Sequence, residues 1–596
     1  MRFGDCGVLP EQTKVGIEFC SDSDNEDDEE SPDDSEESTD EGAGAGGSAG
    51  SAGDCRGALG HGRAKRPRLG VDAAVGPGPG PKSLDGLLSW PTQYVKCFAS
   101  AGLMHRVSQH LDAGVTLSSD FSGVGSFEQA ARQIREAMDA ECVGVGRGFQ
   151  SIHVCDNAQV PRLLLLGHDG PEKARHVFSD VLTQIPKNAL ADIRRIFQLH
   201  KRRYEERLHD LSETSERMTR RALQRDVGGA MIKCIVERLH GIQVHQFDYC
   251  HVHKKQCPLQ EVLVIGGLTF WAAGSTCTDH SPANQQYPGI FGETLFSLIA
   301  WCQSVACHKP DIFLHECTPG FPLWLLEQYL GGIYTLQSRI WCPTDLGIPA
   351  RRKRRYTLGF RKETMVEAAP AFSFSSSGFE RLVYRTIDAD AISFWWSGQS
   401  LAMANRLAKN RRVYQDLSHM SMDDLMPVAG IERRRAYERL ARLDPQADSK
   451  SWFAKLDQNP DATLSPSVLP TLLRKSELFC LSVGLGAQIN RYMEVEEMMT
   501  SLLLPAPRYN WGACDRRGDT VGPSHELGCS EAWASISSIS IGQGRSICGN
   551  GMSLIQVGLC IMIALATHAK REMPAVGRSL HSRDPEHGCE SDSDLD

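Results

Sequence analysis

Gly274-Ser275-Thr276-Cys277-Thr278-Asp279-His280-Ser281-Pro282 comes shortly after the apolar run Glu261–Leu268, and this order indicates the fold class. That run is short, rich in β-branched residues and ends among glycines, which predicts a buried strand. An open α/β sheet places its chemistry on the loops just past the carboxyl ends of its strands. Cys277 is therefore a candidate nucleophile. A buried, inert thiol is the ordinary alternative for any one of the chain's 20 cysteines.

The composition is that of a large globular protein. The 596 residues are enough for two or more domains, and the hydrophobic and charged contents are 41% and 23%. The net charge of -10 is concentrated in the first segment, so it does not exclude a nucleic-acid partner. The cysteines follow no disulfide-like spacing and no apolar signal sequence opens the chain, so we expect free thiols in a reducing compartment. We expect no membrane span, and Leu554–Leu565 predicts a core helix.

The first 83 residues predict a disordered acidic tail. Asp22–Glu41 is mostly Asp, Glu and Ser, and such a sequence cannot bury enough apolar area to offset the entropy lost on ordering. Arg63–Arg68 is a short basic cluster that we interpret as a nuclear localisation signal, with a chance cluster as the alternative. Gly76–Pro81 alternates Gly with Pro and predicts a linker, so folding is expected to begin near Leu84.

A second set of motifs predicts a nucleoside-binding edge. Val115–Phe121 predicts a strand, and the turn Ser122–Gly125 leads into a helix, where glycines and free N–H groups allow a ligand close to the backbone. Ser151–Cys155 predicts the next strand, ending at Asp156, and His176–Asp180 repeats this strand-then-Asp pattern. Because such acidic residues can accept hydrogen bonds from ribose, we favour a nucleoside site over a tight turn without a ligand.

Glu316 and two arginines are candidates for the same reaction as Cys277. Pro310–Glu316 predicts another buried strand, which delivers Glu316 as a general acid or as a simple salt-bridge partner. Arg352 and Arg354 alternate, so on a strand they would share one face. A second localisation signal is the alternative for these arginines, but the apolar residues that follow favour an ordered strand.

Two basic stretches are candidates for nucleic-acid contact. Residues 188–226 predict a long helix with Arg and Lys along it, and residues 369–464 combine Arg with Trp. Such surfaces can follow phosphates, and an ordinary solvated helix surface is the alternative for both.

Metal-binding residue types gather between residues 245 and 257. Imidazole and thiolate at short spacing can bind zinc. The spacing matches no zinc finger, so we favour side chains without a metal over a zinc site, which stays the alternative. The residues concerned are His245, Asp248, Cys250, His251, His253 and Cys257.

The order of these motifs, from about Val115 to Leu565, resembles the DNA (cytosine-5-)-methyltransferase family. Its glycine loop FxGxG is matched by Phe121–Gly125, with Ser126 in place of a further glycine and Ser119 in place of an aspartate. The Thr-Cys-Thr and Gly-Asn-Gly-Met letters resemble divergent algal or protist members. The resemblance implies S-adenosylmethionine as cofactor, held by Phe121, Gly123, Gly125, Asp156, Asp180 and Asn550.

The catalytic motifs match in part. Cys277 matches the Cys of Pro-Cys-Gln, although Thr276 and Thr278 replace its neighbours. Glu316 matches the Glu of Glu-Asn-Val, with Cys317 in place of Asn. The Gln-x-Arg-x-Arg motif is matched by Arg352 and Arg354, with Ala350 in place of Gln, and the stretch supporting the recognition domain by Arg491 and Glu497. The resemblance implies catalytic roles for Cys277, Glu316, Arg352 and Arg354.

The resemblance implies an α/β fold, a Rossmann-like methyltransferase sheet with an inserted target-recognition domain. It divides the chain into a tail (1–83), a catalytic lobe (84–365), a target-recognition region (366–469), a return to the lobe (470–566) and a disordered tail (567–596). The implied reaction is methylation of cytosine C5 in DNA through a covalent cysteine adduct. A tRNA methyltransferase and an inactive nucleic-acid-binding protein are the alternatives. We expect a nuclear protein whose partners are DNA, or alternatively RNA, and chromatin proteins that bind the acidic tail.

Overall fold

The computed structural model describes residues 77–141, 143, 146–168, 173–209, 217–261, 267–281, 284, 288–396, 421–458, 460, 464–504 and 540–571. The acidic stretch Asp22–Glu41 and the basic cluster Arg63–Arg68 lie outside the described residues. Within the described parts of the chain, every cysteine is a free thiol.

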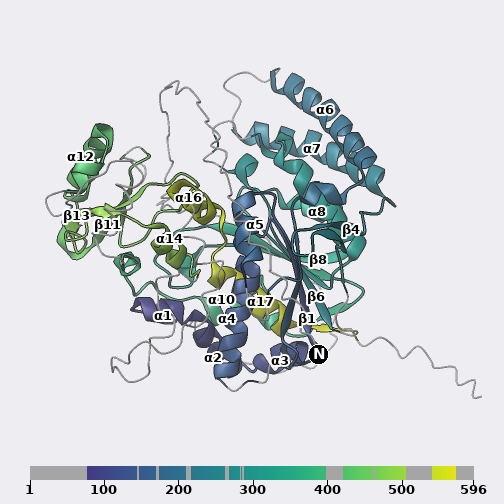
Figure 1. The fold of residues 1–596 in the computed structure, drawn as a ribbon, viewed down its shortest axis with the longest axis horizontal. Coiled ribbons are helices and arrows are strands. Elements are labelled where there is room, and N and C mark those ends of the chain that lie inside the picture. Colours follow the sequence, from purple (N-terminus) through teal and green to yellow (C-terminus); the bar gives the residue numbers. More distant parts are fainter. Residues whose placement is uncertain are drawn as a thin grey trace, which may run out of the picture. The chain divides into compact units, whose positions relative to one another are not determined.

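Seven strands form the central sheet. They are β1 (Val115–Asp120), β2 (Phe149–Cys155), β3 (His176–Phe178), β6 (Leu268–Gly274), β7 (Ile312–Cys317), β8 (Tyr334–Trp341) and β9 (Arg354–Arg361). Their order is β3-β2-β1-β6-β7-β9-β8, with β1, β6 and β8 labelled in Figure 1. The pairs from β3 to β7 are parallel, and β9 runs antiparallel to both of its neighbours. The expected Rossmann-like α/β sheet is confirmed.

The strand order reverses at β1. β2 and β3 follow on one side of β1, and β6 and β7 lie on the other. In open α/β sheets, ligands bind outside the carboxyl ends of the strands at such a reversal. The loops that leave β1 and β6 at this point contain Phe121–Gly125 and Cys277.

The strand before Cys277 lies later in the chain than expected. The sequence predicts a strand over Glu261–Leu268, whereas β6 spans Leu268–Gly274, and residues 262–266 lie outside the described residues. Two apolar runs follow one another here, and periodicity alone cannot tell which one pairs with β1. The first strand also ends one residue early, at Asp120, because Phe121 has a φ of 52° that breaks the extended backbone.

Helices cover both faces of the sheet (Figure 1). One face packs against α2 (Trp90–Ser100), α3 (Met104–Ala113), α4 (Ser126–Ala140) and α17 (Leu554–Thr567). The other packs against α6 (Lys187–His209), α7 (Arg217–Leu239), α8 (Thr294–His308) and α9 (Leu323–Leu330). β7 shows why: Leu314 belongs to the first core and Phe313 to the second, because successive strand residues point to opposite faces.

The expected core helix is present as α17, whose 14 residues are all buried. The longer segment Ile541–Thr567 has the length and hydropathy of a membrane-crossing helix, although 89% of its most apolar window is buried inside the protein. Such burial is typical of a core helix. The basic stretch expected as one long helix is instead two packed helices, α6 and α7, whose connection lies outside the described residues.

A second, four-stranded sheet lies C-terminal to residue 450. Its strands are β11 (Ser451–Lys455), β12 (Ser465–Pro466), β13 (Leu478–Gly484) and β14 (Arg491–Tyr492), in the order β12-β11-β13-β14. It joins strands from both sides of the expected domain boundary at 469. α12 (Val428–Ala441) packs on it, and Nη2 of Arg491 lies 2.8 Å from Oε1 of Glu497 in α14 (Val495–Ser501). The other α-helices among the described residues are α1 (Leu84–Leu88), α5 (Gln159–Leu166), α10 (Ser377–Val383) and α16 (Ile541–Asn550).

Both expected tails are shorter than predicted. Gly78 donates its N–H to the carbonyl of Tyr384 at 3.2 Å, so this part of the Gly-Pro segment is tied to the folded chain. At the other end, β15 (His568–Lys570) pairs with β10 (Met365–Glu367). Backbone pairing with distant residues anchors both segments, and local composition does not reveal such partners.

Candidate active site

The loop after β1 passes through three residues with positive φ. Phe121, Gly123 and Gly125 have φ values of 52°, 57° and 75°. A Cβ on Gly125 would lie 2.6 Å from Cε1 of His168, so glycine is required by both the backbone and the space. A Cβ on Gly123 would meet no described atom within 4 Å. The glycine loop is therefore formed, it leaves space beside Gly123, and α4 begins directly after it at Ser126.

Asp156 holds this loop against the end of β2. The N–H of Gly123 donates to Oδ2 of Asp156 at 2.9 Å, and the N–H of Ala158 donates to Oδ1 at 2.9 Å. Burial raises the pKa of Asp156, although these two backbone donors oppose the shift. The structure thus brings Asp156 to the glycine loop as a half-buried side chain.

Asp180 lies at the end of the neighbouring strand β3. Its Oδ1 accepts a hydrogen bond from the N–H of Leu182 at 2.9 Å, which caps the short 3-10 helix Val181–Gln184. Strands β2 and β3 pair with Cys155 opposite Phe178, so Asp156 and Asp180 leave the sheet at the same edge. The two predicted acidic residues therefore belong to one edge.

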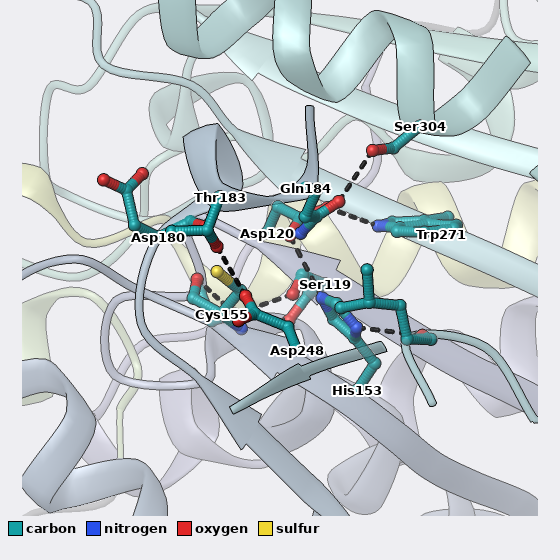
Figure 2. Close-up of polar contacts among 12 residues, drawn as sticks. Ser119, Asp120, His153, Cys155, Asp180, Thr183, Gln184, Asp248, Trp271 and Ser304 are labelled. Carbon is teal, nitrogen blue, oxygen red and sulfur yellow. Dashed lines mark hydrogen bonds and ion pairs between the residues drawn. The ribbon is translucent and has the colours of Figure 1, made fainter. Parts of the chain in front are cut away.

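A buried carboxylate that the sequence did not single out supports this edge (Figure 2). Oδ2 of Asp120 accepts a hydrogen bond from Nε1 of Trp271 at 2.7 Å, and Oδ1 lies 3.1 Å from Nε2 of His153. Gln184 also donates to Asp120, at 3.4 Å, and accepts from Ser304 at 2.6 Å. Asp120 is fully buried and joins β1, β2 and β6. Its role is to hold the sheet beneath the loops.

Ser119 occupies the position where the resemblance expects an aspartate. Its hydroxyl donates to Oε1 of Glu128 in α4 at 2.7 Å and lies 2.7 Å from Oγ of Ser122. Burial raises the pKa of Glu128 to about 7. Ser119 therefore links β1, the glycine loop and α4 through its hydroxyl.

Cys277 and Glu316 leave the sheet on neighbouring strands. In the parallel pair β6–β7, Gly274 lies opposite Glu316, and Cys277 follows three residues after Gly274. A Cβ on Gly274 would lie 3.5 Å from Oε2 of Glu316, so the carboxylate lies against the end of β6. The Cys277 side chain is half-buried, and Thr276 and Thr278 on either side are exposed.

Glu316 forms a buried ion pair with Arg354. Oε1 of Glu316 lies 3.1 Å from Nε of Arg354, and the two side chains are 7% and 9% exposed. Arg354 is the first residue of β9, the strand next to β7. Burial raises the pKa of Glu316, while Arg354 and Arg352 oppose the shift. A carboxyl whose pKa is raised keeps its proton to a higher pH than an ordinary Glu, which favours a role as proton or hydrogen-bond donor.

The same groups set the charge around the cysteine. Burial raises the pKa of the Cys277 thiol, Arg354 and Arg352 lower it, and Glu316 raises it. Cys277 thus feels the charges of all three other predicted catalytic residues. The thiolate, which is the nucleophilic form, depends on the two arginines for its stabilisation.

Arg352 lies just before β9, which is a correction to the expectation that it shares a strand face with Arg354. Its side chain is buried, and both Nη atoms donate to the carbonyl of Gly549 at 3.2 Å. Its backbone N–H donates to Sγ of Cys342, and this local bonding replaces strand pairing. Arg352 therefore anchors a C-terminal segment at the site.

That C-terminal segment contains Asn550, the last residue of α16. Asn550 is exposed, and the contact with Arg352 is made by the preceding carbonyl of Gly549. Met552 then approaches the end of β6, where the loop that bears Cys277 (the cysteine loop) begins. A Cβ on Gly274 would lie 3.5 Å from Sδ of Met552. The segment is thus placed beside the end of β6, and its contacts come from the backbone of Gly549 and the side chain of Met552.

A basic cavity of about 400 Å³ adjoins the cysteine loop. His280, three residues after Cys277, lines it together with Pro319 and Gly320, which follow β7. Its lining consists of Arg221, Gln224, Arg225, His280, Ile290, Pro319, Gly320, Phe321, Pro322, Leu323, Trp324 and Arg355. Three arginines and aromatic side chains are a suitable surface for phosphates and bases. The sequence indicated a basic helix here but not which arginines face a cavity.

No protein-family model matches this chain, and no curated protein matches it. Solved structures that it resembles are methyltransferases. One is the Entamoeba histolytica methyltransferase EhMeth, with 8% identity, a TM-score of 0.32, and coverage of 76% of this chain and 97% of that chain. Another is a putative DNA modification methyltransferase encoded within an E. coli prophage, with 13% identity, a TM-score of 0.34, and coverage of 76% and 98%. A third is the S. pombe Dnmt2 methyltransferase, with 12% identity, a TM-score of 0.31, and coverage of 75% and 96%.

Proposed function

We propose that this chain methylates C5 of cytosine in nucleic acid, with S-adenosylmethionine as methyl donor and Cys277 as covalent nucleophile. The observation that supports this most is the placement of Cys277, Glu316 and Arg354 at the ends of three adjacent strands, on one edge of the sheet. The glycine loop leaves the sheet from β1, next to the cysteine strand β6. This arrangement supports the proposal that the nucleophile, the general acid and the cofactor share the edge of the sheet at which β1 and β6 end.

The residues at the end of β1 fit the proposed cofactor. Gly123 leaves open space beside its backbone, and the N-terminus of α4 follows it. Asp156 offers a carboxylate for ribose hydroxyls, and Asp180 lies on the same edge. When bound, S-adenosylmethionine would supply an electrophilic methyl group. The open face of Gly123 is the observation of this structure that favours a ligand there.

The chain's own residues then account for the chemistry. The Cys277 thiolate adds to C6 of the flipped cytosine, and the electron pair of the 5,6-double bond moves to make C5 nucleophilic. Glu316 donates a hydrogen bond or proton at N3, which stabilises this charge. Arg354 holds Glu316 in place and lowers the pKa of Cys277. Once C5 carries the methyl group that S-adenosylmethionine would supply, a base takes the C5 proton. The electron pair of that C–H bond re-forms the 5,6-double bond, the C6–S bond breaks, and Cys277 leaves as a thiolate.

We propose DNA as the substrate class, and the basic cavity beside His280 as the surface that receives neighbouring phosphates. Nuclear localisation, predicted from Arg63–Arg68, is part of this proposal because the proposed substrate, DNA, is found in the nucleus. A tRNA substrate would use the same catalytic groups, so the experiment below includes it as an outcome.

Covalent trapping tests the proposal. The protein is incubated with S-adenosylmethionine and a duplex that contains 5-fluorocytosine, and adducts are resolved on a denaturing gel. We expect an adduct with the native chain and none with Cys277→Ser. Cys234→Ser, which removes an exposed thiol elsewhere, is the matched control and should still form the adduct. An adduct with a fluorinated tRNA but none with the DNA duplex would show that the substrate is RNA. No adduct on either substrate, with cofactor still bound, would favour the inactive binding protein.

A further inference from the structure

Four metal-binding side chains meet at the β3 edge of the central sheet. His176 begins β3, Cys250 ends β4 (Phe247–Cys250), and Cys257 lies in β5 (Lys255–Pro258). His253 lies in the turn that joins β4 to β5. One nitrogen or sulfur atom from each of the four residues lies within 4.8 Å of the others. Three of the four come from the stretch in which the sequence favoured side chains without a metal, and the fourth, His176, comes from much earlier in the chain.

The distances agree with tetrahedral coordination. Nδ1 of His253 lies 3.5 Å from Sγ of Cys250 and 3.4 Å from Sγ of Cys257. With Zn–S and Zn–N bonds of about 2.3 and 2.05 Å, a tetrahedral angle separates sulfur from nitrogen by about 3.6 Å. Both cysteines are free thiols, so neither sulfur is used in a disulfide. Two thiolates and two imidazoles form a donor set typical of structural zinc.

His176 supplies an independent indication of a ligand. Its side chain is 3% exposed, and neither ring nitrogen has a hydrogen-bond partner among the described residues. Such a buried imidazole is costly unless something satisfies it. Oε1 of Glu261 lies 3.7 Å from Nε2 of His176, close enough to orient the ring once the other nitrogen binds a metal. With a metal ion on one ring nitrogen and Glu261 beside the other, both buried nitrogens of His176 would have a partner.

The hairpin that bears these residues has little apolar core of its own. Cys250 and Cys257 are two of the five buried members of its cluster, and Phe247 and Tyr249 are 59% and 43% exposed. An isolated two-stranded hairpin is marginally stable in water. A metal bound by both cysteines would supply the missing stabilisation.

We propose that His176, Cys250, His253 and Cys257 bind one Zn²⁺ ion as a closed structural site. The four protein ligands leave no position for substrate, so the ion has no place in the methyl transfer. It clamps the β4–β5 hairpin to β3, where His251 already donates its N–H to the carbonyl of Val177 at 2.8 Å.

The clamp also reaches the cofactor edge. Asp248 of the hairpin accepts a hydrogen bond from Oγ1 of Thr183 at 2.5 Å, and His245 donates its N–H to the carbonyl of Gln184 at 2.7 Å (Figure 2 shows the first). Thr183 and Gln184 belong to the short helix that Asp180 caps. The zinc site is therefore inferred to fix the position of Asp180 indirectly, through the hairpin and the short helix Val181–Gln184.

Metal analysis of the full-length protein tests the site. After purification under reducing conditions, we expect about one zinc per chain by inductively coupled plasma mass spectrometry. The double variant Cys250→Ser/Cys257→Ser should contain none, and Cys234→Ser, an exposed thiol on α7, should keep its zinc. Absence of zinc from the reduced native protein, or retention of zinc by the double variant, would overturn the proposal.

A second measurement on the native chain avoids dependence on the variants folding. A strong chelator should lower the melting temperature, and stoichiometric Zn²⁺ should restore it. Replacement of zinc by Co²⁺ should give the intense visible absorption of a tetrahedral cobalt–thiolate site. A melting temperature unaffected by chelator, or a mass lower by two hydrogens that shows a Cys250–Cys257 disulfide in the isolated protein under reducing conditions, would contradict the site. None of these readouts depends on methyl transfer.

Discussion

Nε of Arg354 lies 3.1 Å from Oε1 of Glu316, with both side chains almost wholly buried beside the cysteine loop. This pair joins the ends of two antiparallel strands and places a carboxyl with a raised pKa at the site. The burial of the pair gives Glu316 one partner that fixes its position and leaves Oε2 directed toward the end of β6.

Replacement of Glu316 tests its role as a general acid. Glu316→Gln should lower the turnover rate by about 10²- to 10⁴-fold, because an amide cannot donate the proton at N3. Binding of S-adenosylmethionine, measured by calorimetry, should be unchanged. Glu327→Gln, at an exposed position on α9, is the control and should keep full activity. Activity within a few-fold of the native protein would remove Glu316 from the mechanism.

The charge of Arg354 should control the pH dependence of Cys277. Burial raises the pKa of this thiol and Arg354 lowers it, so removal of the arginine leaves the pKa higher still. Arg354→Gln should therefore shift the pH profile of Cys277 alkylation by iodoacetamide to more alkaline pH. Mass spectrometry of the Cys277 peptide separates this thiol from the others.

Lys353→Gln removes a neighbouring exposed charge and serves as the control for that shift. Its alkylation profile should stay near that of the native protein, because solvent screens an exposed charge. A profile for Arg354→Gln that is unchanged, or that moves toward acid, would show that Arg354 does not stabilise the thiolate.

The sequence predicted those parts of the fold and site that depend on local pattern. The glycine loop, the Asp156 strand end and Glu316 at the end of its strand were all visible as short motifs. The strand before Cys277 was misplaced because two apolar runs compete for it, and pairing with β1 decides between them. Contacts between distant residues were invisible, notably the bond from Arg352 to Gly549.

The Asp120 network and the four-residue metal cluster were missed for a related reason. Asp120 has its structural role only through its contacts with His153 and Trp271, which lie on two other strands. His176 completes the cluster at Cys250 only because β3 brings it there. A spacing argument needs neighbours in the sequence, and these partners are neighbours only in the folded protein.

The two loop glycines should differ in how they respond to alanine. Gly125→Ala adds a Cβ within 2.6 Å of His168 at a φ of 75°, so it should lower the free energy of unfolding by more than the roughly 1–2 kcal/mol of left-handed strain. Gly123→Ala adds only the strain, because no described atom lies within 4 Å. Both should weaken cofactor binding.

Urea unfolding and calorimetric titration of S-adenosylmethionine measure the two effects separately. The informative result is Gly123→Ala, which should bind cofactor poorly although most of its stability is kept. Full cofactor affinity in this variant would show that the open space beside Gly123 is not the cofactor site.

The basic cavity should contribute to nucleic-acid binding through Arg221 and Arg225. The double variant Arg221→Gln/Arg225→Gln should weaken binding of a DNA duplex and reduce the slope of log K against log salt by about 1 for each phosphate that the protein no longer neutralises. Fluorescence anisotropy across a sodium chloride series measures both. The control is Arg202→Gln/Arg203→Gln, which removes two exposed arginines from α6, outside the cavity lining. Since both double variants change the net charge equally, a general electrostatic effect would weaken them alike, and an equal decrease in affinity in the control would exclude a specific role for the cavity.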